Sequence, residues 1–357
     1  MCGIVGGVSN KNITPLLLEG LNLLEYRGYD SSGLIVLTKN NTFDRARSVG
    51  KVKNLEDSLK KRKHQIIGNI GIAHTRWATH GEPSNHNAHP HISKNSVSIV
   101  HNGIIENYLE LKNNQLANGY NFTSETDTEV IAHAIDFAMK TSSNIISSVQ
   151  KALTTLKGSY GLGIVSSKYP NQLIAAKKGS PLVIGIGKSG NYIASDQMAL
   201  LSVTKRFIFL EDGDVADINI DKITIYNRDG QVTNRPIKTS TLKKGQVSKG
   251  LYGHFMQKEI FEQPQAIRDT LESRITNNSV LISAFGSNAK KIFSNVKQIQ
   301  IIACGTSFNA GIVAKYWLED IAKIPCNVEV ASEYRYRRPI LLAKTLFITL
   351  SQSGETA

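Results

Sequence analysis

Cysteine is scarce in this chain of 357 residues, which contains Cys2, Cys304 and Cys326 and no others. Three thiols cannot form a disulfide framework, and an odd number is easiest to accommodate where thiols stay reduced. No apolar run reaches the length of a membrane span, and the N-terminus lacks the basic start and apolar stretch of a secretory signal. We therefore expect a soluble, cytoplasmic protein in which any cysteine chemistry is thiol chemistry.

Acidic residues are also few, at 29 against 42 basic ones, and the formal net charge is +13. Such a surplus can attract nucleic-acid phosphates. The lysines are nevertheless spread through segments such as residues 51–63 and 243–249, without interleaved aromatic residues or zinc-finger spacing. We predict no nucleic-acid and no membrane partner, and anionic small substrates explain the charge equally well.

The first two thirds of the chain show the pattern of one large layered domain. Short strands are adjacent in sequence with helices grouped between them, which predicts an α+β fold with largely antiparallel sheets. A helix begins after Thr14, the expected N-cap, with Pro15 in its first turn. The other predicted helices cover residues 107–118, 128–139 and 145–156, and the predicted strands cover residues 2–8, 33–37, 70–74, 96–101, 161–166, 173–177, 182–186, 192–194 and 223–226.

The last third of the chain shows a different order of predicted helices and strands. Residues 236–250 lack periodic apolar residues and are typical of a linker. Beyond them we predict a helix at residues 254–271, strands at 299–303, 327–330 and 345–350, and a helix at 308–322. This βαβ order predicts an α/β doubly wound parallel sheet. We divide the chain into a domain of residues 1–240, a linker of residues 241–252 and a second domain of residues 253–357.

A thiol directly follows the initiator methionine, because the second residue is Cys2. A small residue at this position permits removal of the methionine, which leaves a cysteine with a free α-amino group. That amino group titrates near ~8 and the thiol near ~8.5, so at neutral pH the amine can accept the thiol proton. The alternative is a small buried residue in an edge strand, and Cys2 alone does not decide between the two.

Two further motifs follow predicted strands. Arg76, in HTRWATHG at residues 74–81, offers a guanidinium that can hold a carboxylate by two parallel hydrogen bonds. Asn102 and Gly103 offer a side-chain amide and a backbone N–H, two donors suited to a developing oxyanion.

An acidic motif, SETDTE at residues 124–129, precedes a predicted helix. Asp127 can hold an ammonium group. Alternatively, Thr126 and Glu129 form a capping box and Asp127 favours the first helical turn. The two interpretations are compatible.

Five segments in this order resemble the class II glutamine amidotransferases, the N-terminal-nucleophile family: CGIVG at residues 2–6, YRGYDSSG at 26–33, the Arg76 loop, Asn102 with Gly103, and Asp127. The resemblance implies an N-terminal-nucleophile hydrolase fold, a layered αββα sandwich. It also implies that Cys2 attacks the carboxamide of L-glutamine, that Asn102 and Gly103 stabilise the tetrahedral oxyanion, and that water hydrolyses the thioester after ammonia leaves.

The same resemblance implies that Arg76, Thr79 and His80 bind the α-carboxylate of the substrate and that Asp127 binds its α-amino group. It also implies that Trp77 guards the route by which ammonia leaves and that Arg27 orders the site.

Three histidines, His86, His89 and His91, lie close together in a Pro- and Asn-rich loop. Their spacing can indicate zinc, but no carboxylate or thiolate completes the set, and the resembled family needs no metal. We predict a loop packed near the glutamine site, and no metal or cofactor.

Two loops rich in hydroxyl groups follow strands of the second domain: CGTS at residues 304–307 and SQSGET at 351–356. Hydroxyls and backbone N–H groups at a helix N-terminus, at the carboxyl ends of parallel strands, form a phosphate site. Either loop alone is slightly more typical of an ordinary N-cap. As a pair they resemble the sugar isomerase (SIS) domain, and with YGHFMQKEI at 252–260 and EQP at 262–264 they resemble the glutamine:fructose-6-phosphate amidotransferase family.

This second resemblance covers essentially the whole chain and implies formation of D-glucosamine 6-phosphate from L-glutamine and D-fructose 6-phosphate, in a family that is homodimeric at full length. The residues expected to bind fructose 6-phosphate are Thr306, Ser307, Ser351, Gln352, Ser353 and Thr356, with Cys304 and Gly305 lining the first loop.

The sequence ends at Ala357, directly after the second loop. In the family pattern, the rest of the SIS domain, a second SIS domain and a C-terminal tail follow, and they carry the glutamate, histidine and lysine that isomerise the sugar. We therefore expect a C-terminally shortened chain, with a complete glutaminase half and an incomplete SIS domain, that makes little or no glucosamine 6-phosphate.

Three other interpretations are open. Another class II amidotransferase, such as amidophosphoribosyltransferase or asparagine synthetase, needs a pyrophosphate-sugar or ATP-binding loop after residue 250, and the sequence shows neither. A non-catalytic sugar-phosphate sensor disagrees with the intact Cys2, Arg76, Asn102 and Asp127. A fragment of a split gene is the third.

Overall fold

The computed structural model describes residues 2–25, 30–77, 81–241, 252–271, 275, 279–285 and 288–351. By its internal contacts the chain divides into two units, residues 1–248 and 249–357, which we describe separately. The division into 1–240, 241–252 and 253–357 stays a prediction, since most of the predicted linker lies outside the described residues. Within the described part of the chain, no helix has both the length and the apolar character needed to cross a membrane.

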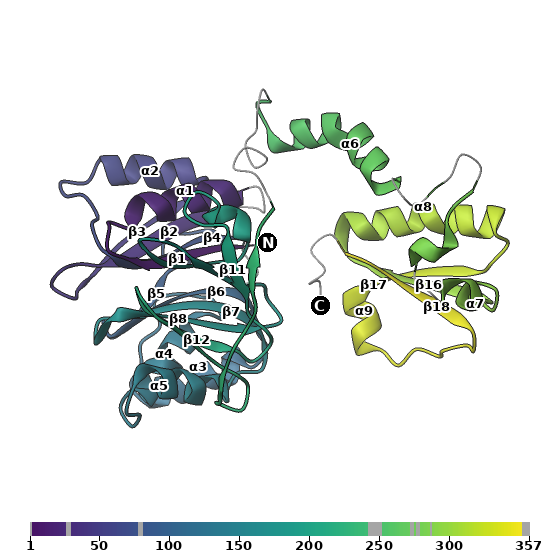
Figure 1. Cartoon of the computed structure of the whole chain (residues 1–357). Helices are drawn as coiled ribbons and strands as arrows, with labels where there is room; N and C mark the ends of the chain where they lie inside the picture. Colours follow the sequence, from purple (N-terminus) through teal and green to yellow (C-terminus); the bar gives the residue numbers. More distant parts are fainter. Residues whose placement is uncertain are drawn as a thin grey trace. The chain divides into compact units, whose positions relative to one another are not determined.

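The first unit consists of two antiparallel sheets and the helices that cover them (Figure 1). Its strands are β1 (Gly3–Ser9), β2 (Ser31–Leu37), β3 (Phe43–Val49), β4 (Ile70–Arg76), β5 (His91–Ser93), β6 (Val97–Ile105), β7 (Gly158–Ser166), β8 (Tyr169–Lys178), β9 (Val183–Ile186), β10 (Gly190–Ala194), β11 (Arg206–Phe209), β12 (Val215–Ile218), β13 (Ile223–Tyr226), β14 (Val232–Thr233) and β15 (Ile237–Thr239). Its helices are α1 (Thr14–Leu24), α2 (Val52–Lys60), α3 (Tyr108–Ala117), α4 (Glu129–Ala138), α5 (Ile145–Leu153) and the 3-10 helix η2 (Gln197–Leu200).

The two sheets pack face to face. The strand order is β15-β11-β9-β10-β1-β4-β2-β3 in the first sheet and β14-β13-β12-β8-β7-β6-β5 in the second. Along β1, Ile4 and Val8 point into the core between the sheets, whereas Val5 packs under α1 on the outer face, as the twofold alternation of a strand requires. A separate apolar core joins the second sheet to α4 and α5. The predicted αββα sandwich is confirmed (Figure 1).

The start of α1 differs from the prediction. Ile13 occupies the N-cap position and Thr14 is the first helical residue, so the expected Thr14 cap is wrong. The Thr14 hydroxyl instead donates to Ile66 O at 2.9 Å and ties the helix to the segment that precedes β4. Pro15 does lie in the first turn. The hydroxyl thus acts as a donor to a distant carbonyl and not as the acceptor that an N-cap requires.

Two regular elements occupy segments that looked irregular in sequence. Helix α2 lies within the lysine-rich stretch 51–63, where Val52 and Leu55 are buried and the lysines face solvent. Strand β15 lies at the start of the segment that resembled a linker, and its residues pair with β11. In α2 the apolar positions Val52, Leu55 and Leu59 follow helical spacing, and the sequence analysis missed them, whereas β15 buries no residue and gave no alternation to detect.

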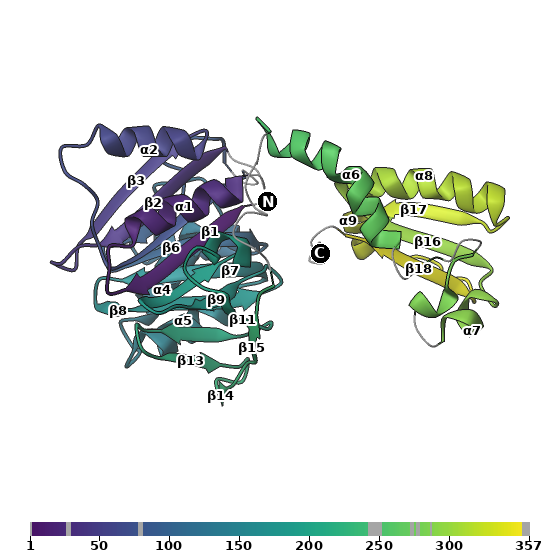
Figure 2. The same cartoon turned by 45° about the horizontal axis from the view of Figure 1, so that its top comes forward.

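The second unit holds a parallel sheet. Its elements are α6 (Phe255–Leu271), the 3-10 helix η3 (Ile282–Phe285), α7 (Ala289–Phe293), β16 (Gln298–Ala303), α8 (Gly305–Ile321), β17 (Cys326–Val330), α9 (Ala331–Tyr336) and β18 (Thr345–Leu350). The strand order is β17-β16-β18, and both pairings are parallel (Figure 2). Ile299, Ile301 and Cys326 form its buried core. The predicted βαβ arrangement is confirmed.

Strand β1 is held at its N-terminal end by Ser195, and this contact generates a first prediction. Ile4 N–H donates to Ser195 Oγ at 3.0 Å, and Ser195 N–H donates to Ile4 O at 3.0 Å. Both residues are buried. Ser195→Ala leaves the Ile4 N–H without its partner, and we expect a loss of about 1–3 kcal/mol in the free energy of unfolding.

Urea denaturation followed by circular dichroism measures this loss. Ser48→Ala is the control, because the Ser48 hydroxyl only donates to the adjacent Val49 O at 3.3 Å in an exposed position. We expect the control to change stability by less than about 0.5 kcal/mol. Equal effects of the two substitutions would contradict the assignment.

Candidate functional site

Cys2 immediately precedes β1, which lies between β10 and β4 in the first sheet. Gly3 pairs with Thr75 of β4, so Cys2 lies beside the end of that strand. Trp77 N–H donates to Cys2 Sγ at 3.1 Å, and the thiol lies 3.6 Å from Trp77 O. The backbone of Trp77 therefore fixes the thiol, while its side chain is 56% exposed.

Burial raises the pKa of the Cys2 thiol above its ordinary value. The hydrogen bond from Trp77 N–H and the nearby charge of Arg76 oppose this effect, and Asp30 adds to it. The neutral thiol therefore predominates at neutral pH. Because the thiolate is the nucleophile, attack by Cys2 needs a base beside it.

Asn102 reaches Cys2 from the second sheet. Its Nδ2 donates to Cys2 O at 3.1 Å, and its Oδ1 lies 2.9 Å from His74 Nε2. Gly103 follows with a φ of +136°, and a Cβ added there would lie 2.1 Å from Ser159 O. Only glycine fits this backbone. The structure thus brings Cys2 and Asn102 together, with Gly103 next along β6.

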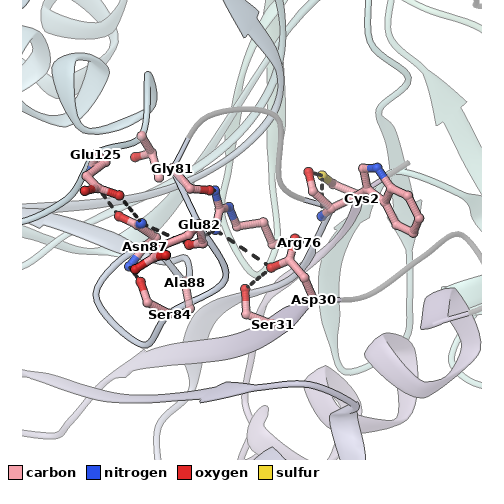
Figure 3. Close-up of polar contacts among 12 residues, drawn as sticks. Cys2, Asp30, Ser31, Arg76, Gly81, Glu82, Ser84, Asn87, Ala88 and Glu125 are labelled. Atoms are coloured by element: carbon pink, nitrogen blue, oxygen red, sulfur yellow. Dashed lines mark hydrogen bonds and ion pairs between the residues drawn. The ribbon is translucent and has the colours of Figure 1, made fainter.

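Arg76 ends β4 and is buried near Cys2 (Figure 3). Its Nη2 donates to Gly81 O at 2.8 Å and its Nη1 to Glu82 O at 3.3 Å, while Nη1 lies 3.8 Å from Asp30 Oδ1. The guanidinium therefore anchors the loop that starts at Gly81 and lies close enough to the thiol to act on its pKa.

Three of the residues predicted to act near Arg76 and Cys2, namely Thr79, His80 and Arg27, lie outside the described residues.

Asn87 was missed by the sequence analysis and joins two loops (Figure 3). The side chain is fully buried. Its Nδ2 donates to Glu82 O at 3.0 Å and to Glu125 Oε2 at 3.0 Å, and its Oδ1 accepts from Glu125 N–H at 2.9 Å. These hydrogen bonds connect the loop that begins at Gly81 to the loop that precedes α4. An asparagine in a loop carries no spacing signal that predicts such partners.

Asp127 is also buried, at 4% exposure, and its Oδ2 accepts from Ile105 N–H at 2.8 Å. Ile105 belongs to β6, the strand that carries Asn102 and Gly103. The carboxylate is therefore tied to the strand that carries Asn102 and Gly103.

The predicted capping box between Thr126 and Glu129 is wrong. The Glu129 carboxylate accepts from the N–H groups of Thr123 and Ser124, with Oε2 2.8 Å from Ser124 N. The Thr126 hydroxyl is bonded to His91 Nε2 at 3.1 Å. The carboxylate thus stabilises the turn before the helix, because that turn offers it two N–H donors.

Two of the three histidines predicted to pack near the site, His89 and His91, are buried beside His74. His89 stacks on His74 with ring centroids 4.2 Å apart and meets His91 edge to face at 4.7 Å. Burial lowers the pKa of His74 to about 3 and the pKa values of His89 and His91 well below their ordinary value. His86 is exposed. Over the described ranges, no group of histidine, cysteine or acidic side chains could hold a metal ion.

The two hydroxyl loops of the second unit leave the same edge of its sheet. Ala303 of β16 pairs with Leu350 of β18, and both strands run in the same direction. Cys304 is the N-cap of α8, whose first turn contains Gly305, Thr306 and Ser307, and Ser351 directly follows β18. The other predicted ligands, Gln352, Ser353 and Thr356, lie outside the described residues.

Comparison with known proteins agrees with this geometry. A glutamine amidotransferase domain model matches residues 74–202 and a SIS domain model matches residues 292–357. The chain is 51% identical over 357 residues to the glutamine--fructose-6-phosphate aminotransferase [isomerizing] of Haemophilus influenzae and to that of Escherichia coli K12. The alignment covers 100% of this chain and 58% of each relative.

Two solved structures share the fold. The glutamine phosphoribosylpyrophosphate amidotransferase from B. subtilis, complexed with ADP and GMP, matches with a TM-score of 0.52 at 19% identity, over 92% of this chain and 65% of that chain. An allosteric regulatory enzyme of purine biosynthesis matches with a TM-score of 0.56 at 20% identity, over 99% of this chain and 69% of that chain.

The backbone at Gly103 generates a second prediction. Gly103→Ala forces a Cβ against Ser159 O at a strained φ, and we expect a loss of about 3 kcal/mol in the free energy of unfolding. Gly119→Ala is the matched control: its φ is +75°, but nothing lies within 4 Å of the added Cβ, so we expect about 1 kcal/mol. Urea denaturation measures both, and similar losses would show that the contact at Gly103 is not a steric limit.

Proposed function

Because the chain belongs to the family of the glutamine--fructose-6-phosphate aminotransferases, we propose that its first unit hydrolyses L-glutamine to glutamate and ammonia, and that this ammonia serves the formation of D-glucosamine 6-phosphate from D-fructose 6-phosphate. The carrying observation is the amide of Asn102, placed 3.1 Å from Cys2 O by a different sheet from the one that holds the thiol. The chain spans 58% of the length of the curated relatives that it matches. Synthesis of the amino sugar is therefore part of the proposal.

The proposed chemistry starts with a proton transfer. After removal of the initiator methionine, the α-amino group of Cys2 accepts the thiol proton, and the thiolate attacks the carboxamide carbon of glutamine. Asn102 Nδ2 and the N–H of Gly103 donate to the tetrahedral oxyanion. The protonated amine returns its proton to the leaving nitrogen, and ammonia departs. Water then attacks the Cys2 thioester, which releases glutamate and restores the thiol.

The groups that hold the amino-acid end of glutamine are proposed on charge and position. The Arg76 guanidinium binds the α-carboxylate with Thr79 and His80, and the Asp127 carboxylate binds the α-ammonium group. Asp127 is buried and tied by Ile105 N–H to the strand of the oxyanion donors, which supports this role.

Two residues are proposed to act around the site rather than on the substrate. Trp77 guards the route of ammonia; its side chain is exposed and its backbone N–H donates to the thiol. Arg27 orders the site.

The second unit is proposed to bind fructose 6-phosphate. Cys304, Gly305, Thr306 and Ser307 form the loop at the N-terminus of α8, where backbone N–H groups favour a phosphate. The parallel pairing of β16 and β18 brings Ser351 to the same edge. The further ligands proposed here are Gln352, Ser353 and Thr356. We also propose a cytoplasmic protein without nucleic-acid or membrane partners that is a homodimer at full length, with domains at residues 1–240 and 253–357.

A nitrogen-tracing experiment tests the glutaminase. The purified chain is incubated with amide-¹⁵N glutamine, with and without fructose 6-phosphate, and the label is followed by NMR. We expect label in free ammonia from the wild type and from Cys304→Ala, and none from Cys2→Ala. Release by Cys2→Ala at the wild-type rate would contradict the nucleophile, and label in glucosamine 6-phosphate would contradict the prediction that these residues alone make little of it.

Asp127→Asn tests the contact to the ammonium group. An asparagine Oδ1 can still accept from Ile105 N–H, so the fold is retained while the charge is lost. We expect the KM for glutamine to rise about 10- to 100-fold, with kcat changed by less than about threefold, since a charge-assisted hydrogen bond contributes roughly 1.5–3 kcal/mol.

The matched control is Asp136→Asn, a buried carboxylate of α4 that accepts from Tyr120 Oη at 2.8 Å. It is expected to lower stability and to leave KM unchanged. An unchanged KM in Asp127→Asn would remove Asp127 from the glutamine site.

A further inference from the structure

A hydrogen bond between His74 and Asn102 crosses the core of the first unit. His74 lies on β4 in the first sheet and Asn102 on β6 in the second, and His74 Nε2 is 2.9 Å from Asn102 Oδ1. His74 is 1% exposed and Asn102 is 7% exposed. The bond is therefore shielded from water at the point where the amide approaches Cys2.

Chemistry fixes the orientation of the Asn102 amide. Cys2 O is a carbonyl oxygen and can only accept, so the amide group that faces it must be Nδ2. The other end, Oδ1, then faces His74 and can itself only accept. His74 must therefore carry its proton on Nε2 and donate it to Asn102.

Among the described residues, the other nitrogen of His74 makes no hydrogen bond of ordinary geometry, although the backbone of His101 lies close enough to favour the protonated ring. His74 Nδ1 is buried and has no hydrogen-bond partner in the part of the chain that the structure describes. An unsatisfied buried acceptor opposes folding. The ring is also held from its face by the stack with His89. His74 thus offers one N–H donor, on Nε2, and the acceptor of that donor is Asn102 Oδ1.

We propose that His74 is a positioning residue for the oxyanion donor: its Nε2–H holds the Asn102 side chain so that Nδ2, and not Oδ1, faces the reacting group at Cys2. The inference rests on the glutamine hydrolysis proposed above. The two ends of an asparagine amide have nearly the same shape, and rotation about its terminal bond is broadly twofold. Without a donor at Oδ1, the amide could present an oxygen to the developing oxyanion, which would repel it instead of stabilising it.

The proton on His74 can be observed without any assay of activity. Protein with ¹⁵N-labelled histidine is examined by NMR, and the His74 signals are assigned by their loss in His74→Gln. We expect the neutral tautomer with the proton on Nε2 and no titration between roughly pH 5 and pH 8, where an ordinary histidine titrates, because burial keeps the pKa of His74 near 3. A proton on Nδ1, or a charged ring in this range, would overturn the inference even if glutamine is hydrolysed.

Kinetics test the consequence for the reaction. His74→Phe keeps a ring that can stack on His89 and removes the donor, and we expect kcat for glutamine hydrolysis to fall about 100-fold, the effect of losing one oxyanion donor, with KM within about threefold of wild type. His74→Gln places an N–H near the position of Nε2 and is expected to restore most of kcat. If His74→Phe retains the wild-type kcat, the proposal fails.

A matched control and a double substitution separate positioning from folding. His133 is a buried histidine of α4 whose Nδ1 bonds Ser93 Oγ at 2.8 Å and whose Nε2 also has no hydrogen-bond partner among the described residues. His133→Phe is expected to lower stability without changing kcat. In an Asn102→Ala background, His74→Phe should change kcat no further, because both substitutions remove the same donor.

Equal reductions by His74→Phe in both backgrounds would show that His74 does not act through Asn102. Absence of ammonia release by the wild type would instead refute the proposed function, and the NMR result would still decide the position of the His74 proton.

Discussion

The site in the first unit depends on the contact that Asn102 makes between the two sheets. The thiol belongs to one sheet and the amide to the other, and the apolar core that includes Ile4, Ile72 and Val100 sets the distance between them. Facing sheets pack about 10 Å apart, so side chains from both can meet only at a defined level of the sandwich. Asn102 is hydrogen-bonded to Cys2 O on one side and to His74 on the other. The way in which the two sheets pack therefore determines the orientation of the Asn102 amide.

Strands and loops contribute differently to this site. Cys2 lies beside β1 and Asn102 lies on β6, and ladder hydrogen bonds on both sides fix the positions of these strands. The groups proposed to hold glutamine come from strand ends and loops, which Arg76 and Asn87 connect through the carbonyls of Gly81 and Glu82. Such a division lets the reacting atoms stay rigid while the loops adapt to the ligand. The buried histidines remain neutral, so they add directional hydrogen bonds without adding charge beside the thiol.

The comparisons separate fold from family. At 19% and 20% identity, the two solved structures share the architecture alone. At 51% identity over 357 residues, the similarity to the aminotransferases extends over both units. The parallel sheet of the second unit brings its two loops to one edge, as the βαβ order predicted, because parallel strands in register end at the same side.

The sequence by itself predicted an α+β domain with antiparallel sheets, the parallel sheet of the second unit and the thiol at Cys2, because periodicity and chain position are local properties. The αββα layering was predicted from the resemblance to the N-terminal-nucleophile family. Tertiary structure decided the partners of polar side chains. Thr14 bonds a carbonyl 52 residues away instead of capping its helix, and Glu129 serves the turn before α4 instead of a capping box. His74 meets Asn102 across 28 residues of chain and two sheets. Local spacing does not specify the hydrogen-bond partners of such groups, and only strand register and sheet packing select them.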